Sequence, residues 1–115
     1  MSVTIFHNPR CSKSRKTLAL LQERGIEPEV RLYLENPPDE AELSALLGLL
    51  GRSPRELMRK GEAEYREQGL ADSALDDEAL IAAMAATPRL IGRPIVLANG
   101  KAALGRPPEA VLDIL

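Results

Sequence analysis

The order of the predicted elements at the start of the chain constrains the fold more than any other feature. Val3-Thr4-Ile5-Phe6-His7 is a short apolar strand. A helix follows from about Ser12 to Arg24, where Gly25 supplies the residue type that commonly ends helices. Residues 29–34 then alternate polar and apolar side chains, which predicts a half-buried second strand. The first third of the chain is therefore a β-α-β half.

The end of the chain supplies a complementary half. Residues 95–97 are a short apolar strand, and Asn99-Gly100 is a strong hairpin signal, so residues 101–105 form an antiparallel return strand. Pro107-Pro108-Glu109 opens a last helix. A β-α-β half joined to a β-β-α half is the plan of a thioredoxin-like α/β fold with a mixed sheet. In such folds a cis-proline precedes the third strand beside the reactive thiol, and Pro94 occupies that place.

A helical insertion over about 39–88 separates the two halves. Asp39-Glu40-Ala41-Glu42 places acidic side chains in the first turn of one helix. Ser53-Pro54-Arg55-Glu56 combines a hydroxyl N-cap, a proline at N1 and a glutamate at N3. Asp76-Asp77-Glu78 begins another helix, which ends before Pro88. With no linker or repeat in the sequence, we expect one domain over 1–115.

Composition narrows the function classes. Aromatic residues make up only 3% of the chain, so the core must consist of Leu, Ile, Val, Ala and Met. The net charge of −2 is close to zero, so the charge balance does not indicate binding to nucleic acid or to a membrane surface. No apolar run is long enough to span a bilayer, and the N-terminus lacks the pattern of a secretory signal. We therefore expect a cytoplasmic protein.

Cys11 is the most informative residue for function. It lies between the first strand and the first helix, where unpaired backbone N–H groups and the helix dipole favour the thiolate and attract anions. Free cysteines are often inert, buried side chains. The flanking residues Arg10, Ser12 and Lys13 are polar or cationic, which favours a reactive thiol here.

The residues around Cys11 exclude several mechanisms. Cys11 to Ser14 is a C-x-x-S sequence without a second cysteine, so a resolving thiol must come from outside the chain. Thr17 stands where the phosphate loop of low-molecular-weight phosphatases requires arginine. One Cys and one His cannot build a zinc site, and no glycine-rich nucleotide loop is present. We expect no metal and no bound cofactor.

Other candidate site residues are three arginines and the residues near Cys11. Arg59, Arg93 and Arg106 each lie at the end of an element, and arginine binds tetrahedral oxyanions through a planar fork. Taken singly, each arginine is typical of a solvated surface residue. A role in binding an oxyanion requires that the three side chains converge near Cys11. His7 either supports the thiolate or has no role. Asn8, Ser14 and Arg15 either order the loop or simply end the strand and begin the helix.

Several motifs resemble the glutaredoxin-coupled arsenate reductase (ArsC) family. They occur in the family's order along nearly the whole chain. They are His7-Asn8-Pro9-x-Cys11-x-x-Ser14-Arg15, Leu32-Tyr33-Leu34-Glu35-Asn36-Pro37-Pro38, Leu57-Met58-Arg59-Lys60, Gly69-Leu70-Ala71, Arg93-Pro94-Ile95-Val96 and Arg106-Pro107-x-Glu109.

The resemblance implies a specific chemistry. The cysteine thiolate of the family attacks arsenate, glutathione displaces the adduct as a co-substrate, and glutaredoxin reduces the resulting mixed disulfide. The family cysteine falls on Cys11, its nearby histidine on His7, and its three site arginines on Arg59, Arg93 and Arg106. Arginines so placed would stabilise the oxyanion as charge develops.

Two alternatives use the same fold. The best-known arsenate reductases have a small residue before the cysteine and Gly-Thr after it, where this chain has Arg10, Ser12 and Lys13. This arsenate-reductase-like loop motivates a glutathione-dependent thiol oxidoreductase with another substrate. The second alternative is an Spx-type regulator, which binds RNA polymerase. Such regulators typically carry a C-x-x-C switch, which Ser14 breaks.

Overall fold

The computed structural model describes residues 3–115 and divides the chain into two compact units. The sheet unit comprises Met1–Asn36 and Arg93–Leu115, and the helical unit comprises Pro37–Gly92. The sheet unit contains β1 (Val3–Phe6), α1 (Ser12–Glu23), β2 (Glu29–Arg31), β3 (Ile95–Ala98), β4 (Lys101–Leu104) and the 3-10 helix η2 (Pro108–Ile114). The helical unit contains α2 (Glu40–Leu50), α3 (Pro54–Leu57), α4 (Ala63–Glu67), α5 (Asp77–Ala86) and the 3-10 helix η1 (Pro88–Leu90).

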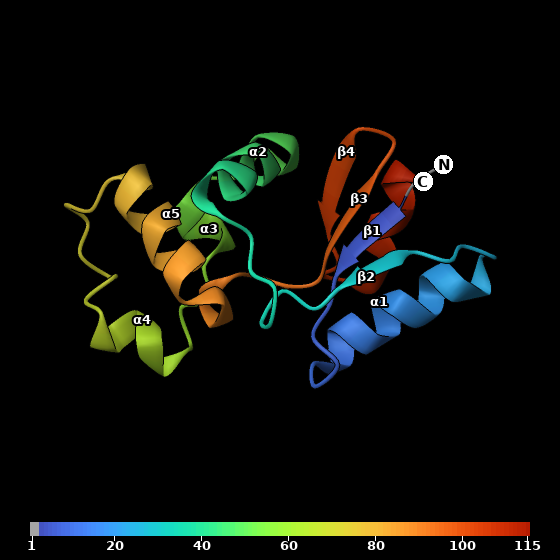
Figure 1. Ribbon diagram of the computed structural model, residues 1–115, viewed down its shortest axis with the longest axis horizontal. Coiled ribbons are helices and arrows are strands. Elements are labelled where there is room, and N and C mark those ends of the chain that lie inside the picture. The colour runs from blue at the N-terminus through green and yellow to red at the C-terminus, as the bar shows by residue number, and fades with distance from the viewer. Residues whose placement is uncertain (1–2) are drawn as a thin grey trace. The chain divides into compact units, whose positions relative to one another are not determined.

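The strands of the described residues form one mixed sheet in the order β2-β1-β3-β4 (Figure 1). β1 pairs in parallel with β2 and antiparallel with β3, which in turn pairs antiparallel with β4. In this register Ile5 lies between Val30 and Val96. The two central strands are thus β1 from the parallel β-α-β half and β3 from the antiparallel hairpin, which confirms the predicted thioredoxin-like fold.

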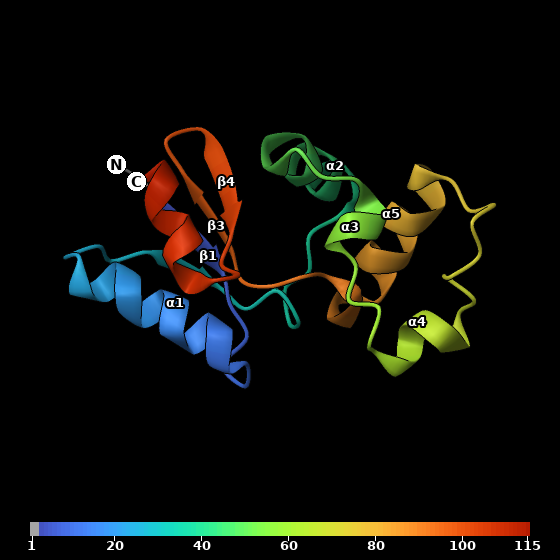
Figure 2. The same cartoon turned by 180° about the vertical axis from the view of Figure 1, so that it is seen from behind.

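One face of the sheet carries the core of this unit. The register places Val3 opposite Ala98 and Ile5 opposite Val96, so apolar side chains of β1 and β3 line up on one face. α1 and η2 lie side by side over that face (Figure 2). The buried cluster between sheet and helices is aliphatic and consists of Val3, Ile5, Leu21, Val96, Ala98 and Val111. The prediction of a core without aromatic residues is nevertheless wrong for the protein as a whole, because Phe6, Tyr33 and Tyr65 are all buried.

Two predicted chain reversals are confirmed. Gly25 adopts a φ of +74° after α1, and its N–H donates to the carbonyl of Gln22 while Ile26 N–H donates to Leu21, the bonds of a Schellman end. Asn99 and Gly100 have φ values of +55° and +71°, as a type I′ hairpin turn requires.

The second strand is shorter than predicted. β2 ends at Arg31, because the N–H groups of Glu35 and Asn36 both donate to the Leu32 carbonyl and turn the chain. The predicted alternation also faces the other way, since Tyr33 is buried. The apolar side chains of Val30, Leu32 and Leu34 are exposed by 44%, 37% and 38%. An edge strand is paired on one side only, so its apolar residues need not enter the core.

The last helix is a 3-10 helix. The Ala110 N–H donates to the carbonyl of Pro107, three residues back. Side chains three residues apart align in a 3-10 helix. Val111 and Ile114 therefore meet the sheet core together, and Val111 is fully buried.

The helices of the helical unit begin as predicted. Asp39 and Glu42 form a reciprocal capping box at the start of α2, and Ser53 and Glu56 form another at α3. The Asp76 carboxylate accepts a hydrogen bond from the backbone at the start of α5. α2 and α3 both contact α5, and the buried side chains of these helices include Leu43, Leu46, Leu47, Leu57, Leu80 and Met84.

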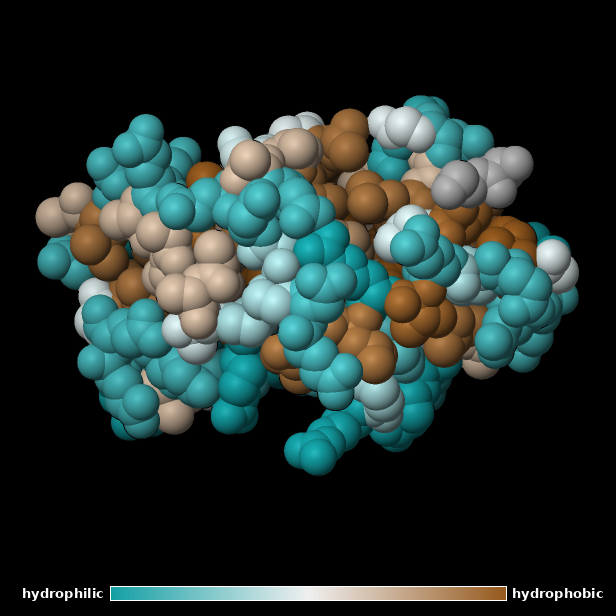
Figure 3. Space-filling model, in the orientation of Figure 1, coloured by the Kyte–Doolittle hydropathy of each residue, from teal (hydrophilic) through white to brown (hydrophobic). Residues whose placement is uncertain are grey.

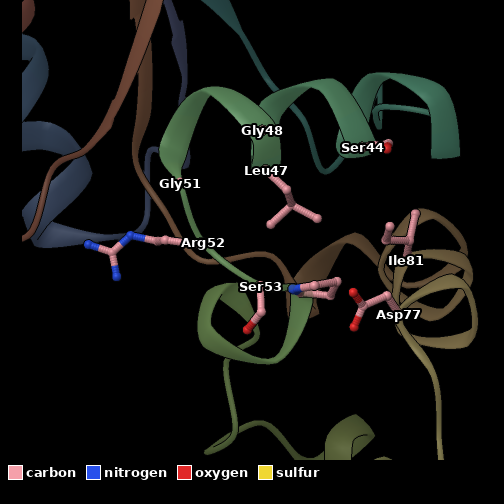
Figure 4. Close-up of a pocket in the computed structure, with 9 residues that line it drawn as sticks. Ser44, Leu47, Gly48, Gly51, Arg52, Ser53, Asp77 and Ile81 are labelled. Carbon is pink, nitrogen blue, oxygen red and sulfur yellow. The ribbon is translucent and has the colours of Figure 1, made fainter.

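A pocket of about 380 Å³ lies among α2, α3 and α5. Leu47 and Asp77 point into it, whereas Arg52 points away (Figure 4). It contains none of the candidate site residues. None of the helices in residues 3–115 is both long and apolar enough to cross a membrane.

The aliphatic core predicts the effect of one truncation. Leu21→Ala should lower the free energy of unfolding by about 2–5 kcal/mol, because Leu21 is fully buried between α1 and the sheet. Leu49, which is 48% exposed, is the matched control. Leu49→Ala should change stability by about 0.5 kcal/mol or less. Urea unfolding followed by circular dichroism measures both, and equal losses would contradict this description of the core.

Candidate active site

Cys11 lies at the carboxyl end of β1, where a short loop leads into α1. The backbone of Cys11 has extended geometry and forms the N-cap of α1, without a side-chain cap. Asn8 orders the loop from both ends, since its side-chain oxygen accepts from Arg10 N–H at 3.0 Å and its carbonyl accepts from Cys11 N–H at 3.0 Å. The guanidinium of Arg15 donates to the Pro9 carbonyl at 2.8 Å. The loop backbone is therefore held by the side chain of Asn8, within the loop, and by that of Arg15, in α1.

Ser14 is the buried partner of this loop. Its hydroxyl oxygen accepts from Asn8 N–H at 3.0 Å and lies 2.6 Å from Nδ1 of His7. Ser14 is fully buried, and His7 and Asn8 are nearly so. Each polar group therefore has a partner, as buried polar groups require. The last position of the C-x-x-S sequence thus connects the helix to the loop.

His7 acts in this arrangement as a neutral group. Its burial, and secondly the positive charge of Arg15, lower its pKa below the ordinary value for histidine. His7 is hence uncharged at neutral pH, and its observed partner is the Ser14 hydroxyl. What the structure assigns to His7 is a hydrogen bond that positions the start of α1.

The surroundings of the Cys11 sulfur favour the thiolate. Partial burial alone would raise the pKa of the thiol. That effect is outweighed by the backbone N–H of Ser14, the charge of Arg93, the N–H of Lys13 and a hydrogen bond from Arg93, so the pKa is lowered. Two of these groups are the free N–H donors of the first helical turn. The helix start and one arginine therefore favour the thiolate form of Cys11.

Arg93 has a further donor directed to no protein group. Its Nε–H is buried and has no hydrogen-bond partner within residues 3–115. A buried donor without an acceptor costs about 1–3 kcal/mol, so native proteins seldom leave one. A bound oxyanion beside Cys11 would supply the acceptor.

A close contact of three segments sets the position of Arg93. Gly105 N–H donates to the Pro94 carbonyl at 2.8 Å. A Cβ on Gly105 would lie only 2.7 Å from both Pro94 Cγ and Thr17 Oγ1. Thr17 belongs to α1 and is itself buried. Only glycine lets the end of β4 meet both the residue after Arg93 and the helix that begins at Cys11.

Arg106 continues this contact. Its Nε donates to the Arg93 carbonyl at 2.8 Å, while the side chain as a whole is exposed. The Arg93–Pro94 peptide bond is cis, as predicted, and so is Arg106–Pro107, which the sequence did not lead us to expect. The sheet unit therefore brings together eight of the predicted site residues, which are His7, Asn8, Cys11, Ser14, Arg15, Arg93, Pro94 and Arg106.

Arg59 lies in the helical unit. Its backbone N–H donates to the Leu90 carbonyl at 2.8 Å, beside a bridge between Met58 and Ile91. Its guanidinium pairs with Glu62, which also pairs with Arg89. The role predicted for Arg59 in binding the oxyanion stays a prediction.

Sequence reasoning missed Gly105 and Thr17. A lone glycine at the end of a predicted strand is a signal for close backbone approach, and Gly105 carried it. In the sequence, Thr17 indicated only that a phosphatase loop is absent, and nothing there indicated its contact with Gly105. Within residues 3–115 no three His, Cys, Asp or Glu side chains gather as metal ligands would.

The family model named ArsC matches residues 6–114 of this chain. The chain belongs to the ArsC family. The loop of residues 7–11, the Arg93-Pro94 segment and the Arg106-Pro107 segment all lie within the matched region.

Several known proteins are similar to this chain over almost the whole length of both chains. An Escherichia coli K12 protein, YfgD, described as uncharacterized, is 63% identical and covers 98% of this chain and 96% of its own. A Neisseria meningitidis serogroup B protein named arsenate reductase is 54% identical over 98% of this chain and 97% of its own. The solved structure of a Vibrio cholerae arsenate reductase aligns with a TM-score of 0.97 at 57% identity, covering 100% and 98% of the two chains.

The surroundings of Cys11 predict how its reactivity depends on pH. Its thiolate is present above the lowered pKa and is lost as the pH falls through it. Arg93→Ala should shift the midpoint of iodoacetamide alkylation to higher pH, because the charge and hydrogen bond of Arg93 favour the thiolate. Arg24→Ala, at the far end of α1, is the matched control. An unchanged midpoint in the Arg93 variant would contradict the assigned environment.

The contact at Gly105 predicts a second effect. Gly105→Ala should destabilise the protein by about 1–3 kcal/mol, because the added methyl group meets Pro94 and Thr17. It should also move the alkylation midpoint by displacing Arg93. Gly61→Ala is the control, since a Cβ there meets nothing within 4 Å. Thermal unfolding of both variants measures the difference, and equal stability would show that the three segments separate easily.

Proposed function

We propose that this protein is an arsenate reductase that uses Cys11 as nucleophile and glutathione and glutaredoxin as reductants. The observation that carries the proposal is the Arg93 Nε–H, a buried donor without a protein acceptor, on the same side chain that lowers the pKa of Cys11. An oxyanion with an electrophilic central atom could accept a hydrogen bond from this Arg93 donor and be attacked by the Cys11 thiolate. Family members that are 54% identical are named arsenate reductase, which supports arsenate as that oxyanion.

The first step joins sulfur to arsenic. The Cys11 thiolate attacks the arsenic atom of hydrogen arsenate, and one oxygen leaves as hydroxide, which takes up a proton to become water. The guanidinium groups of Arg93 and Arg106 stabilise the remaining oxygens through charge-assisted hydrogen bonds. Neutral His7 and Ser14 keep the helix start in place during attack.

The second step reduces arsenic. A glutathione thiolate attacks the Cys11 sulfur, the sulfur–arsenic bond breaks, and its electron pair stays on arsenic. Arsenic passes from the +5 to the +3 state and leaves as arsenite after protonation. Cys11 and glutathione are left joined as a mixed disulfide, so the two thiols have supplied the two electrons.

The third step restores the enzyme. A glutaredoxin thiolate attacks the glutathione sulfur, releases the Cys11 thiolate and carries glutathione away as its own mixed disulfide. An outside thiol fits this chain, because Cys11 is its single cysteine. The same proposal puts the protein in the cytoplasm, where a reduced glutathione pool is maintained.

An NADPH-coupled assay with glutathione, glutathione reductase and glutaredoxin tests the proposal. Wild-type protein should turn over arsenate only when both thiol partners are present. Cys11→Ser should lower turnover to background. Arg93→Ala should lower kcat/KM by about 10²–10³, the usual cost of removing one donor to a developing oxyanion. Arg24→Ala is the matched control and should leave turnover unchanged, and Arg59→Ala in the same assay tests the role predicted for Arg59.

Two results would overturn the proposal. Undiminished turnover in Cys11→Ser would remove Cys11 from the reaction. Absence of turnover in the wild type, with intact-mass analysis still showing a glutathione adduct on Cys11, would favour the thiol oxidoreductase with another substrate, for which the loop around Arg10 and Lys13 is the motivating feature.

A further inference from the structure

A second pocket borders the loop that carries Cys11. Its volume is about 220 Å³, and it lies entirely in the sheet unit. One wall is formed by residues 7–10, which follow β1, and the other by Leu32, Leu34 and Glu35, which follow β2. Because β1 and β2 are parallel, both walls lie at the carboxyl ends of strands. Ligands commonly bind at such an edge in α/β sheets.

The pocket is continuous with the nucleophile loop. Asn8 lines it, and the Asn8 carbonyl accepts the Cys11 N–H. Arg10 lines it and immediately precedes Cys11. His7 lines it and bonds to Ser14 in the first turn of α1. The pocket therefore borders the chain segment that leads directly into Cys11.

The lining of the pocket combines charged and apolar side chains. Arg10 and Glu35 are exposed and opposite in charge, and within residues 3–115 neither side chain forms a hydrogen bond or an ion pair. Leu32 and Leu34 add exposed apolar surface to the lining. In Figure 3, hydrophobic residues gather over β2. The pocket thus presents one cation, one anion and an apolar surface.

We propose that this pocket binds glutathione and directs it to Cys11, an inference that rests on the proposed function. Glutathione carries two carboxylates and one ammonium group on a short flexible chain. Arg10 pairs with a carboxylate, Glu35 pairs with the ammonium group, and the methylene groups lie against Leu32 and Leu34. Arsenate does not fit this lining, because Glu35 would repel an anion and an apolar wall would offer it nothing.

Titration of ¹⁵N-labelled protein with S-methylglutathione tests the pocket without any redox chemistry. The backbone signals of residues 7–10 and 32–35 that carry an N–H should shift. Arg10→Ala and Glu35→Gln should each weaken binding about threefold to tenfold, the range for one charge-assisted contact near solvent. Arg24→Ala and Glu29→Gln are the matched controls, since both residues are exposed and neither lines the pocket. Both controls should bind as the wild type does.

The outcomes separate this inference from the proposed function. If arsenate is not turned over but S-methylglutathione binds with these shifts, the pocket stands and the substrate changes. If arsenate is turned over while the shifts fall outside the pocket, or while both variants keep wild-type affinity and wild-type KM for glutathione, the pocket is wrong and the proposed function stands. In the supporting case both variants raise the KM for glutathione and leave that for arsenate unchanged.

Discussion

The absence of a side chain at Gly105 is the constraint on which the site depends. Three segments distant in sequence meet there, namely α1 through Thr17, the start of β3 through Pro94, and the end of β4. The contact brings the cation of Arg93 to the helix start that carries Cys11. If a methyl group separated these segments, the Cys11 sulfur would keep its backbone N–H donors, but Arg93 would lie further from it. Thiolate formation here is thus a packing property of the sheet unit as much as an electrostatic one.

The loop of residues 7–11 is ordered by a small set of polar contacts. The side chains of Asn8, Ser14 and Arg15 satisfy most of the loop's backbone, and His7 joins them as a neutral partner. Arg15 is the one charged group among these four residues, and its charge helps to keep His7 neutral. The positive field at the sulfur then comes from groups that do not titrate near neutral pH, which are the helix start and an arginine.

Much of this could be predicted from sequence, because the signals were local. Gly25, Asn99-Gly100 and the Ser53-Glu56 cap each determine the backbone within a few residues. The extent of β2 could not, because its end depends on a turn whose apolar residues resemble a strand. The junction at Gly105 depends on residues far apart in the sequence. The unpaired Nε–H of Arg93 could not be predicted from a sequence pattern either, since burial and lack of a partner are properties of the assembled fold.

The buried position of Ser14 has a consequence for the kinetics of any disulfide that Cys11 forms. A second thiol at that position would have to replace a hydroxyl that is hydrogen-bonded to both His7 and Asn8. The side chain at this position therefore orders the loop and is not a resolving thiol. Cys11 thus has no tethered partner, and the high effective concentration of a linked group is not available to it. Its oxidation is bimolecular, and its rate follows the abundance of the thiols around the protein.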